Sequence, residues 1–285
     1  MDPRVKPAAG GGCLRVARVR FLGAHAETQE DVVAIEEPLE IQLGGAPLAV
    51  LMRTPGHDEE LALGFLVTER VVAAPAQVLS VRHCRAVSDP DASENVLRVV
   101  LAPGVEVDLD ALRRNLYASS SCGICGKATI ANALVSAPPL TDASRFEAAF
   151  FTALPSRLEA AQPAFAATGG LHAAGLFGPD GELLVVREDV GRHNAVDKVI
   201  GWALRAGRLP LSGHVLLVSG RISYELVQKA LVARIPVLAA VSAPSSLAVE
   251  LAQSAQLTLI GFLRGGSFNV YGEPARVVAR PDPKS

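Results

Sequence analysis

In the second half of the chain, short apolar runs alternate with amphipathic stretches. The runs have the length and composition of buried strands, and the stretches repeat their apolar residues at the spacing of a helix. Strands are expected at 171–177, 182–188, 214–219, 236–242 and 257–263, and helices at 194–207, 223–234 and 245–255. This alternation predicts a three-layer α/β domain with a largely parallel sheet. The runs at 268–271 and 275–280 are candidates for further strands of the same sheet.

Strand-like runs and one helix dominate the first half of the chain. A hairpin is expected over residues 42–53, with Gly44 and Gly45 at its turn. The expected helix, residues 55–70, has three acidic residues in its first turn, where the helix dipole favours negative charge. Further strands are expected at 14–21, 32–37, 79–84 and 95–101. These elements predict a smaller, β-rich α+β domain.

The two patterns meet in a stretch with helical character. Helices are expected near 108–117, at 127–135 and at 144–161, the last with a break at Pro155. Residues 1–12 have no apolar pattern and are expected to form a flexible tail. The predicted division is therefore a tail over 1–12, a β-rich domain over 13–115 and an α/β domain over 116–285.

Composition narrows the class of protein. The 285 residues have a formal net charge of −2, so no strong positive field points to nucleic acid or an acidic membrane. The chain has no cationic start followed by an apolar run, and no apolar stretch approaches the roughly 18 residues of a membrane helix. Four cysteines in so long a chain do not make a disulfide framework. We therefore expect a soluble, cytoplasmic protein.

Polar or glycine-rich loops follow four of the predicted strands. If those strands are parallel, the loops meet at one edge of the sheet, where ligands of open α/β sheets bind. Helices that begin in such loops attract phosphate, and arginines can clamp it. The residues concerned are Asp189, Arg192 and His193; Ser219 and Arg221; Ser242, Ser245 and Ser246; and Arg264, Gly265 and Gly266. Ordinary turns and helix caps use the same residue types. Four loops in register favour a phosphate-bearing ligand.

Known nucleotide motifs do not account for this expected site. The chain has neither a dinucleotide fingerprint nor a Walker sequence. His193 lies in the densest polar run and is a candidate binding residue. His172 follows a pair of glycines and is equally open to a structural role.

Cys122 and Cys125 form a CxxC pair in the stretch SSSCGICGKATI. A structural zinc site needs about four ligands, and no second pair is evident, so we expect no metal. Dithiol redox chemistry is a second possibility, because a helix and Lys127 follow the pair. Sulfur carriage as a persulfide is a third, and the serine- and glycine-rich surroundings suit an exposed thiol. The spacing alone leaves the three about level.

Five motifs in order resemble those of the FdhD family, the sulfur carrier proteins required for formate dehydrogenase activity. They are SSSCGICGKATI, TGGLHAAGLF, REDVGRHNAVDKVIG, SGRISYELVQKA and FLRGGSFNVY, and the resemblance runs from about residue 30 to residue 271. It implies a fold similar to cytidine deaminases and a homodimer. It also implies that a cysteine desulfurase loads sulfur onto the CxxC pair, for delivery to molybdenum in the bis(molybdopterin guanine dinucleotide) cofactor of formate dehydrogenase.

The resemblance assigns roles to particular residues. Cys122 matches the persulfide position and Cys125 its partner. The stretch matched to cofactor binding is Phe262, Leu263, Arg264, Gly265, Gly266 and Ser267. With the strand-end residues Ser219, Arg221 and His193, these form the expected cofactor-binding set.

Two other functions compete with sulfur transfer. A chaperone could bind and hand over the cofactor without moving sulfur. A zinc-dependent deaminase needs a His-x-Glu motif before Pro-Cys-x-x-Cys. Here Ala174 stands where the glutamate belongs, after the cysteines rather than before them, and Ser121 replaces the proline. Deaminase chemistry is therefore disfavoured.

Overall fold

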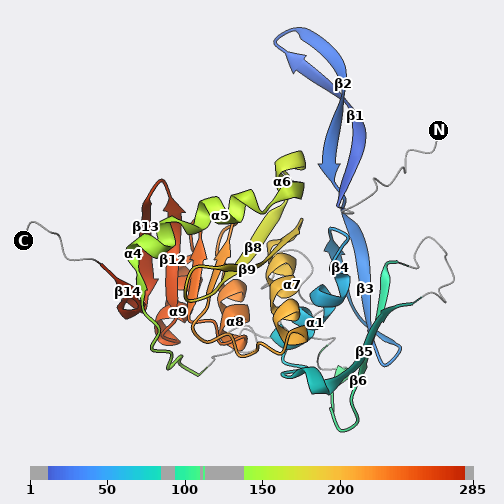
Figure 1. Cartoon of the computed structure of the whole chain (residues 1–285). Coiled ribbons are helices and arrows are strands. Elements are labelled where there is room, and N and C mark those ends of the chain that lie inside the picture. The colour runs from blue at the N-terminus through green and yellow to red at the C-terminus, as the bar shows by residue number, and fades with distance from the viewer. Residues whose placement is uncertain (1–11, 85–93, 110–111, 113–137, 280–285) are drawn as a thin grey trace, which may run out of the picture.

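A computed structural model describes residues 12–84, 94–109, 112 and 138–279 (Figure 1). Within them the chain is a mixed α/β protein with several sheets. The largest sheet has six strands in the order β13-β12-β11-β10-β8-β9. Its strands are β8 (His172–Phe177), β9 (Leu183–Asp189), β10 (Val215–Val218), β11 (Val237–Ala240), β12 (Thr258–Arg264) and β13 (Ser267–Gly272). Each expected strand from 171 to 271 is confirmed to within two residues.

The expectation of a largely parallel sheet is wrong, because the sheet is mixed. Only the β10–β11 and β11–β12 pairs are parallel, whereas β8–β9, β8–β10 and β12–β13 are antiparallel. Two tight turns reverse the chain, at Gly181 and at Gly265–Gly266, and all three glycines have positive φ. Because β8 is antiparallel to both of its neighbours, strands β9 to β12 still run in one direction.

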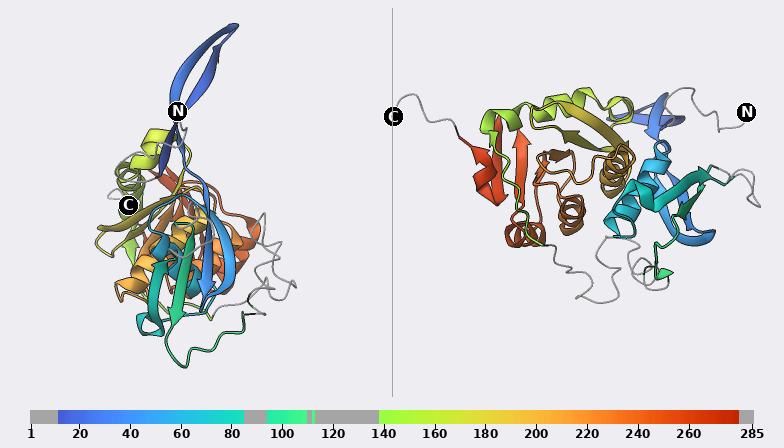
Figure 2. Two further views of the ribbon diagram at one scale, coloured as in Figure 1. Left: turned by 90° about the vertical axis from the view of Figure 1, so that its right-hand side faces the viewer. Right: turned by 60° about the horizontal axis from the view of Figure 1, so that its bottom comes forward.

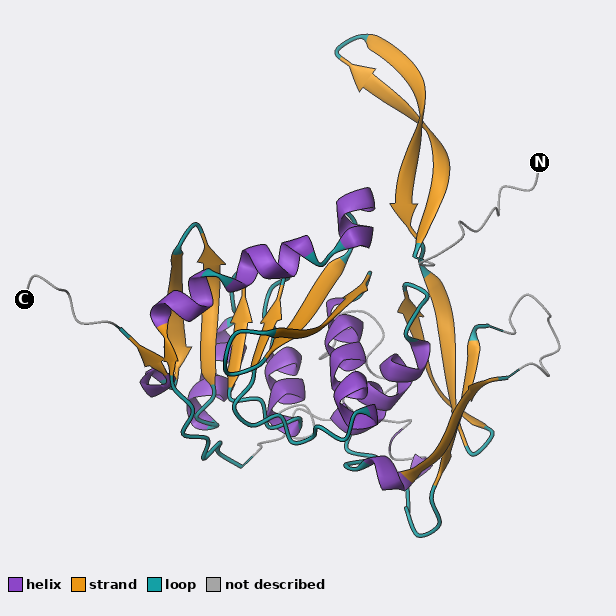
Figure 3. Ribbon diagram, in the orientation of Figure 1, coloured by secondary structure: helices purple, strands orange, loops and turns teal. Residues whose placement is uncertain are grey.

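Helices cover both faces of this sheet (Figures 2 and 3). One face packs against α7 (Arg192–Arg205), α8 (Tyr224–Val232) and α9 (Ser246–Ser254), and the other against α4 (Ala148–Thr152) and α5 (Leu154–Ala160). Side chains of β10 alternate between these layers: Leu216 and Val218 join the first, and Val215 and Leu217 the second. Near-continuous apolar strands are the consequence of burial on both faces.

The segment before β8 departs from the expected broken helix. It begins with β7 (Phe146–Glu147), which pairs in parallel with β14 (Val277–Val278). The helix breaks at Ala153 rather than at Pro155, which lies in the first turn of α5. Proline fits there because that position needs no intrahelical N–H donor. A further helix, α6 (Pro163–Thr168), was not predicted.

The first half of the chain forms a four-stranded sheet in the order β4-β3-β6-β5. Its strands are β3 (Glu37–Leu43), β4 (Ala46–Arg53), β5 (Val78–His83) and β6 (Val96–Leu101). Helix α1 (Asp58–Thr68) and the 3-10 helix η1 (Pro75–Gln77) lie between β4 and β5 in the chain. The predicted Gly44–Gly45 hairpin is confirmed, with φ of 60° and 91°. Leu39 and Ile41 of β3 are fully buried in the core shared with α1.

Before this sheet, β1 (Cys13–Leu22) and β2 (His25–Ala34) form a long antiparallel hairpin, here called the arm. The arm projects away from the other described elements in Figure 1 and in the left view of Figure 2. Among the described residues, α6 is the element with which the arm makes its main contacts. The expected strand 14–21 is confirmed as β1 to within one residue at each end. The expected strand 32–37 is wrong in its bounds, because it spans the end of β2 and the start of β3; the rest of β2 was missed because most of it is polar and both sides of the arm face solvent.

Helices α1 and α7 join the two halves of the chain by a close crossing. A β-carbon on Gly64 would lie 1.7 Å from the carbonyl oxygen of Asp197, and one on Gly201 would lie 1.8 Å from that of Glu60. Only glycine fits at both points. One apolar cluster includes residues of both helices, so residues from either side of the predicted boundary share a core. Residue 115 itself lies outside the described residues. Within the part of the chain that the structure describes, no helix is both long and apolar enough to cross a membrane.

Candidate functional site

The C-terminal ends of β9, β10, β11 and β12 lie along one edge of the six-stranded sheet, here called the strand-end edge. This follows from their common direction and agrees with the sequence-based expectation. Helices α7, α8 and α9 begin in the loops after β9, β10 and β11, with Gly191, Ser223 and Ser245 as their N-caps. Their positive ends therefore face this edge, which favours an anionic ligand.

Part of the polar run 188–198 is buried structure rather than ligand-facing surface. The Asp189 carboxylate is fully buried and lies 2.7 Å from the Lys198 ammonium. It also accepts hydrogen bonds from the Asn194 side chain at 2.9 Å and the Gly191 N–H at 2.8 Å. The Lys198 ammonium donates to the carbonyl oxygen of Thr54 at 2.9 Å. This network ties α7 to the end of β4.

His193, a predicted binding residue, connects the first turns of α7 and α8. Its Nε2 lies 2.9 Å from Glu225 Oε2 and 3.2 Å from Ser223 Oγ. Two buried polar atoms have no hydrogen-bond partner among the described residues: Arg192 Nε and the other carboxylate oxygen of Glu225, Oε1. One is a donor and the other an acceptor, so a ligand with both kinds of group can satisfy them.

Sequence analysis missed Glu225. The available signal was an acidic residue in the first turn of a helix that opens from a strand-end loop. That signal is ambiguous, because the helix dipole favours an acid at any such position. Only the structure shows that Glu225 faces His193.

Ser219 and His172 lie where β8 begins beside the end of β10. The Ser219 hydroxyl accepts a hydrogen bond from the Ala173 N–H at 2.9 Å and so prolongs the ladder between these strands. Arg221, two residues further on, is exposed. Burial lowers the pKa of His172, and the positive charges of Arg192 and His193 lower it further, against a smaller opposite effect of Asp189. Burial and its neighbours therefore favour the neutral form of His172.

The substitution His172→Gln tests this assignment through pH. The folded-state pKa is lowered, so the unfolded chain takes up the proton first as pH falls below about 6.5. The free energy of unfolding of the unmodified protein should therefore fall between pH 7.5 and 5.5, and the variant should show a shallower fall. Urea denaturation at both values measures the slopes. Equal slopes would show that His172 is not held neutral by the fold.

The stretch Phe262–Ser267 comprises the end of β12, a turn at Gly265–Gly266 and the first residue of β13. Arg264 pairs with Ser267 across the turn, and Gly265 and Gly266 have φ of 59° and 77°. A β-carbon on either glycine meets no atom within 4 Å, so backbone conformation explains these two residues.

The side chains before the turn point in different directions. Leu263 is buried in the core on the α4–α5 side of the sheet, which leaves only its backbone for a ligand. Phe262 and Arg264 are exposed, and the Arg264 guanidinium lies 5.9 Å from the centroid of the Phe262 ring. Phe262 has a φ of 55° at an irregularity of the strand, and its N–H donates to the carbonyl oxygen of Ser242. The turn is therefore tied to the loop after β11 at the strand-end edge.

Cys122 and Cys125, with the helix expected at 127–135, lie outside the described residues. Shortly after them in the sequence, the Leu140 N–H donates to the carbonyl oxygen of Ala255, just past the end of α9. That contact is at the opposite edge of the sheet from the strand-end loops. Among the described residues, no group of three or more histidine, cysteine or acidic side chains is placed to hold a metal ion.

The fold and this edge define a mixed α/β protein whose strand-end loops suit a phosphate-bearing ligand. Comparison with known proteins then identifies the family. The profile of the FdhD/NarQ family matches residues 34–278. The chain belongs to that family.

Several relatives are similar over nearly their whole length. The sulfur carrier protein FdhD of Mycobacterium bovis is 54% identical over 267 residues, which cover 91% of this chain and 97% of the relative. That of Streptomyces avermitilis is 52% identical over 270 residues, with 92% and 94% covered. Among solved structures, one from Desulfotalea psychrophila, described as a formate dehydrogenase accessory protein, superposes with a TM-score of 0.73 at 24% identity. It covers 94% of this chain and all of that one, and it shows the shared fold.

Proposed function

We propose that this protein is a cytoplasmic sulfurtransferase that activates formate dehydrogenase. Cys122 accepts sulfur from a cysteine desulfurase as a persulfide, with Cys125 as its partner thiol. The sulfur is then transferred to molybdenum in the bis(molybdopterin guanine dinucleotide) cofactor. The observation that carries this proposal is 54% identity, over 91% of the chain, to a relative named as a sulfur carrier protein. The CxxC pair supplies the thiols that such a role requires.

Thiol chemistry alone accounts for every bond and electron in the proposed transfer, so the protein needs no bound metal for it. In loading, the Cys122 thiolate attacks the outer sulfur of the donor's persulfide, and the donor cysteine leaves as a thiolate. Delivery as sulfide requires two electrons. The Cys125 thiolate supplies them by attacking the inner sulfur of Cys122, which forms a Cys122–Cys125 disulfide and releases sulfide. A cellular dithiol then reduces that disulfide by exchange.

The molybdenum cofactor is the substrate in this scheme, and the strand-end edge is its proposed binding site. Three helix N-termini and Arg264 suit phosphate groups, while Arg192 Nε and Glu225 Oε1 offer an unused donor and acceptor. The proposed binding set comprises Phe262, Leu263 through its backbone, Arg264, Gly265, Gly266, Ser267, Ser219, Arg221 and His193.

A second candidate function is cofactor binding without sulfur transfer, and the same edge favours it. Such a chaperone differs from a sulfurtransferase only in whether sulfur moves through Cys122. We also propose that the protein is a homodimer and that its α/β half is related in fold to cytidine deaminases. The mixed sheet between two helix layers supports that relationship.

Arg264→Ala should weaken the binding of guanosine diphosphate, which represents the nucleotide part of the cofactor. Loss of one charge-assisted contact corresponds to about a tenfold rise in Kd. Isothermal titration calorimetry measures the change. Arg208→Ala is a matched control. The Arg208 guanidinium also lies over an aromatic ring, 5.4 Å from the centroid of Trp202, but Arg208 comes just after the C-terminal end of α7, away from the strand-end edge. Equal affinities for both variants would remove Arg264 from the site.

A further inference from the structure

Thr54 directly follows β4 in the first half of the chain, yet its polar groups bond to the α/β half. It is 3% exposed. Its N–H donates to Asp189 Oδ2 at 3.2 Å, and its carbonyl oxygen accepts from the Lys198 ammonium at 2.9 Å. Its hydroxyl oxygen accepts from the Val190 N–H at 3.2 Å. Thr54 is therefore bonded to the end of β9, to the loop after it and to α7.

A second contact from β4 reaches the same segment. The Asn194 side chain donates to the carbonyl oxygen of Met52 at 2.8 Å and to Asp189 Oδ1 at 2.9 Å. The Gly191 N–H donates to the same Asp189 oxygen at 2.8 Å. The end of β4 therefore holds both the loop 189–191 and the first turn of α7, and Figure 1 shows β4 beside this helix.

The loop 189–191 has little room to adjust. A β-carbon on Gly191, the N-cap of α7, would lie 2.9 Å from Asn194 Nδ2 and 3.4 Å from Asp189 Oδ1. The Val190 N–H is part-buried, and its hydrogen bond goes to the Thr54 hydroxyl. Without that hydroxyl the N–H loses its partner, and the loop must shift to give it another.

The loop leads directly into residues of the proposed ligand site. Arg192 and His193 follow Gly191 as the first two residues of α7. Arg192 Nε is buried and has no hydrogen-bond partner among the described residues. His193 Nε2 lies 2.9 Å from Glu225 Oε2 in the first turn of α8. A shift of the loop therefore moves both side chains relative to α8.

The Arg192 side chain also passes close to the loop after β10. A β-carbon on Gly220 would lie 3.7 Å from Arg192 Cδ and 3.1 Å from His172 Nδ1. The glycine leaves room for both side chains at this point, so the place of Arg192 depends on how the two loops meet.

We propose that Thr54 is a positioning residue of the strand-end site. Its hydroxyl fixes the loop 189–191, and the loop holds Arg192 and His193 in place for the nucleotide part of the cofactor. The inference rests on the proposed function, because it requires that the nucleotide binds at the strand-end edge. Thr54 itself does not touch the ligand. The first half of the chain thereby takes part in a site whose proposed binding residues all come from the second half.

Isothermal titration calorimetry with guanosine diphosphate tests this role through two variants of one side chain. Thr54→Val keeps the shape and removes the hydroxyl, and it should raise Kd about tenfold, which corresponds to about one lost hydrogen bond. Thr54→Ser keeps the hydroxyl and removes only a methyl group. Its Kd should stay within about twofold of that of the unmodified protein.

Thr68→Val is the matched control, because the Thr68 hydroxyl also joins the two halves at a buried carboxylate. It donates to Asp197 Oδ1 at 3.0 Å and accepts from the Lys229 ammonium at 3.0 Å. Asp197 lies past the first turn of α7, away from the loop 189–191. Urea denaturation should show that Thr68→Val loses at least as much stability as Thr54→Val, whereas its Kd for guanosine diphosphate should stay the same.

The comparison survives a failure of Thr54→Val to fold, which circular dichroism would reveal. Thr54→Ala and Thr54→Ser differ by the same hydroxyl oxygen, so the alanine variant should then bind about tenfold more weakly than the serine variant. Equal affinities for these two variants would overturn the positioning role.

The outcomes separate this role from the proposed function. If Thr54→Val binds as tightly as the unmodified protein, the positioning role is wrong and the proposed binding site stands. If Thr68→Val weakens binding equally, general loosening between the halves is the cause, and the role of Thr54 is again overturned. If the unmodified protein does not bind guanosine diphosphate, both the binding site and the positioning role are wrong, whereas persulfide loading is untouched.

Discussion

Cys122→Ala should abolish the activation of formate dehydrogenase. The proposed carrier binds sulfur through one covalent bond to this residue, and an alanine side chain has no atom that can form it. Because the change only removes a thiol, the free energy of unfolding and the affinity for guanosine diphosphate should stay the same. The measurement is formate oxidation in cells that lack their own accessory protein and carry the variant on a plasmid.

Cys84→Ala is the matched control for loss of a thiol. Cys84 is half-buried at the end of β5, where its sulfur lies 3.6 Å from the Arg98 guanidinium. It lies far along the chain from the CxxC pair, and its loss should preserve activation. Retained activation by Cys122→Ala would contradict sulfur transfer through this residue and favour the chaperone function.

Lys198→Met should lower the free energy of unfolding by about 3–5 kcal/mol, the usual consequence of removing one partner of a buried ion pair. The side chains of Asp189 and Lys198 are 0% and 1% exposed. Without the ammonium, the carboxylate remains buried with only neutral donors around it. Urea denaturation followed by circular dichroism measures the change.

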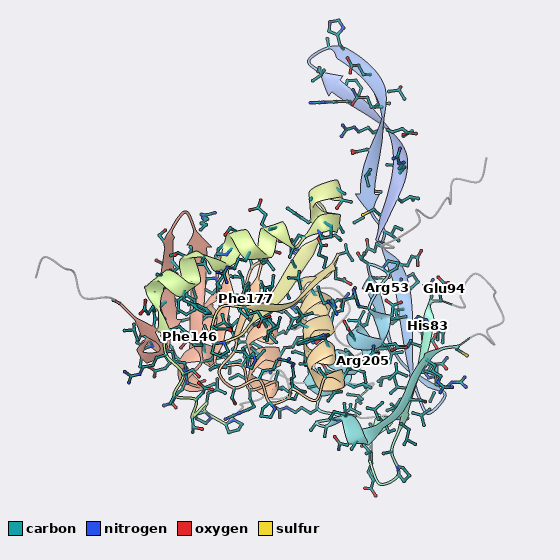
Figure 4. The ribbon with its side chains drawn as sticks, viewed as in Figure 1. Arg53, His83, Glu94, Phe146, Phe177 and Arg205 are labelled. Atoms are coloured by element: carbon teal, nitrogen blue, oxygen red, sulfur yellow. The ribbon has the colours of Figure 1, made fainter. Side chains whose placement is uncertain are left out.

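Two further variants separate burial from charge. Lys198→Met combined with Asp189→Asn removes both charges and should regain part of the lost stability. Arg205→Ala removes an ion pair with Glu59 whose side chains are 51% and 40% exposed, and it should cost less than about 1 kcal/mol. Figure 4 shows Arg205. A Lys198→Met effect as small as that of Arg205→Ala would show that the buried pair is not central to the junction.

The α/β half was predictable because its strands are buried on both faces. Such strands form continuous apolar runs, and the helices between them have clear amphipathic spacing. Strand direction was not predictable, because the sequence shows where a strand lies but not which neighbour it pairs with. Burial of Phe146 and Phe177 on the α4–α5 side (Figure 4) depends on such long-range pairing.

Solvent exposure explains what was missed in the first half. Both sides of the arm face water, so β2 has no alternation of apolar and polar residues to reveal it. The acidic first turn of α1 was correctly predicted, but its carboxylates do more than interact with the helix dipole. Asp58 lies 2.9 Å from the guanidinium of the buried Arg53, and Glu60 lies 2.9 Å from that of Arg187. Those partners come from β4 and β9, which local sequence cannot connect.

The position of the candidate site in the fold was predictable, whereas the residues that form it were only partly so. The loops after four strands identified the strand-end edge. However, a polar run looks the same in sequence whether it faces a ligand or forms an internal network. The run 188–198 does both: Asp189 and Lys198 are internal, whereas His193 lies against the Glu225 carboxylate, whose other oxygen has no partner among the described residues.

Mass spectrometry of the protein after incubation with a cysteine desulfurase and cysteine tests the central claim most directly. The sulfurtransferase account predicts a gain of about 32 Da, one sulfur atom, on the peptide that contains Cys122 and Cys125. The gain should disappear on treatment with a dithiol reductant and should be absent in Cys122→Ala. An unmodified peptide, from protein that still activates formate dehydrogenase, would contradict the account.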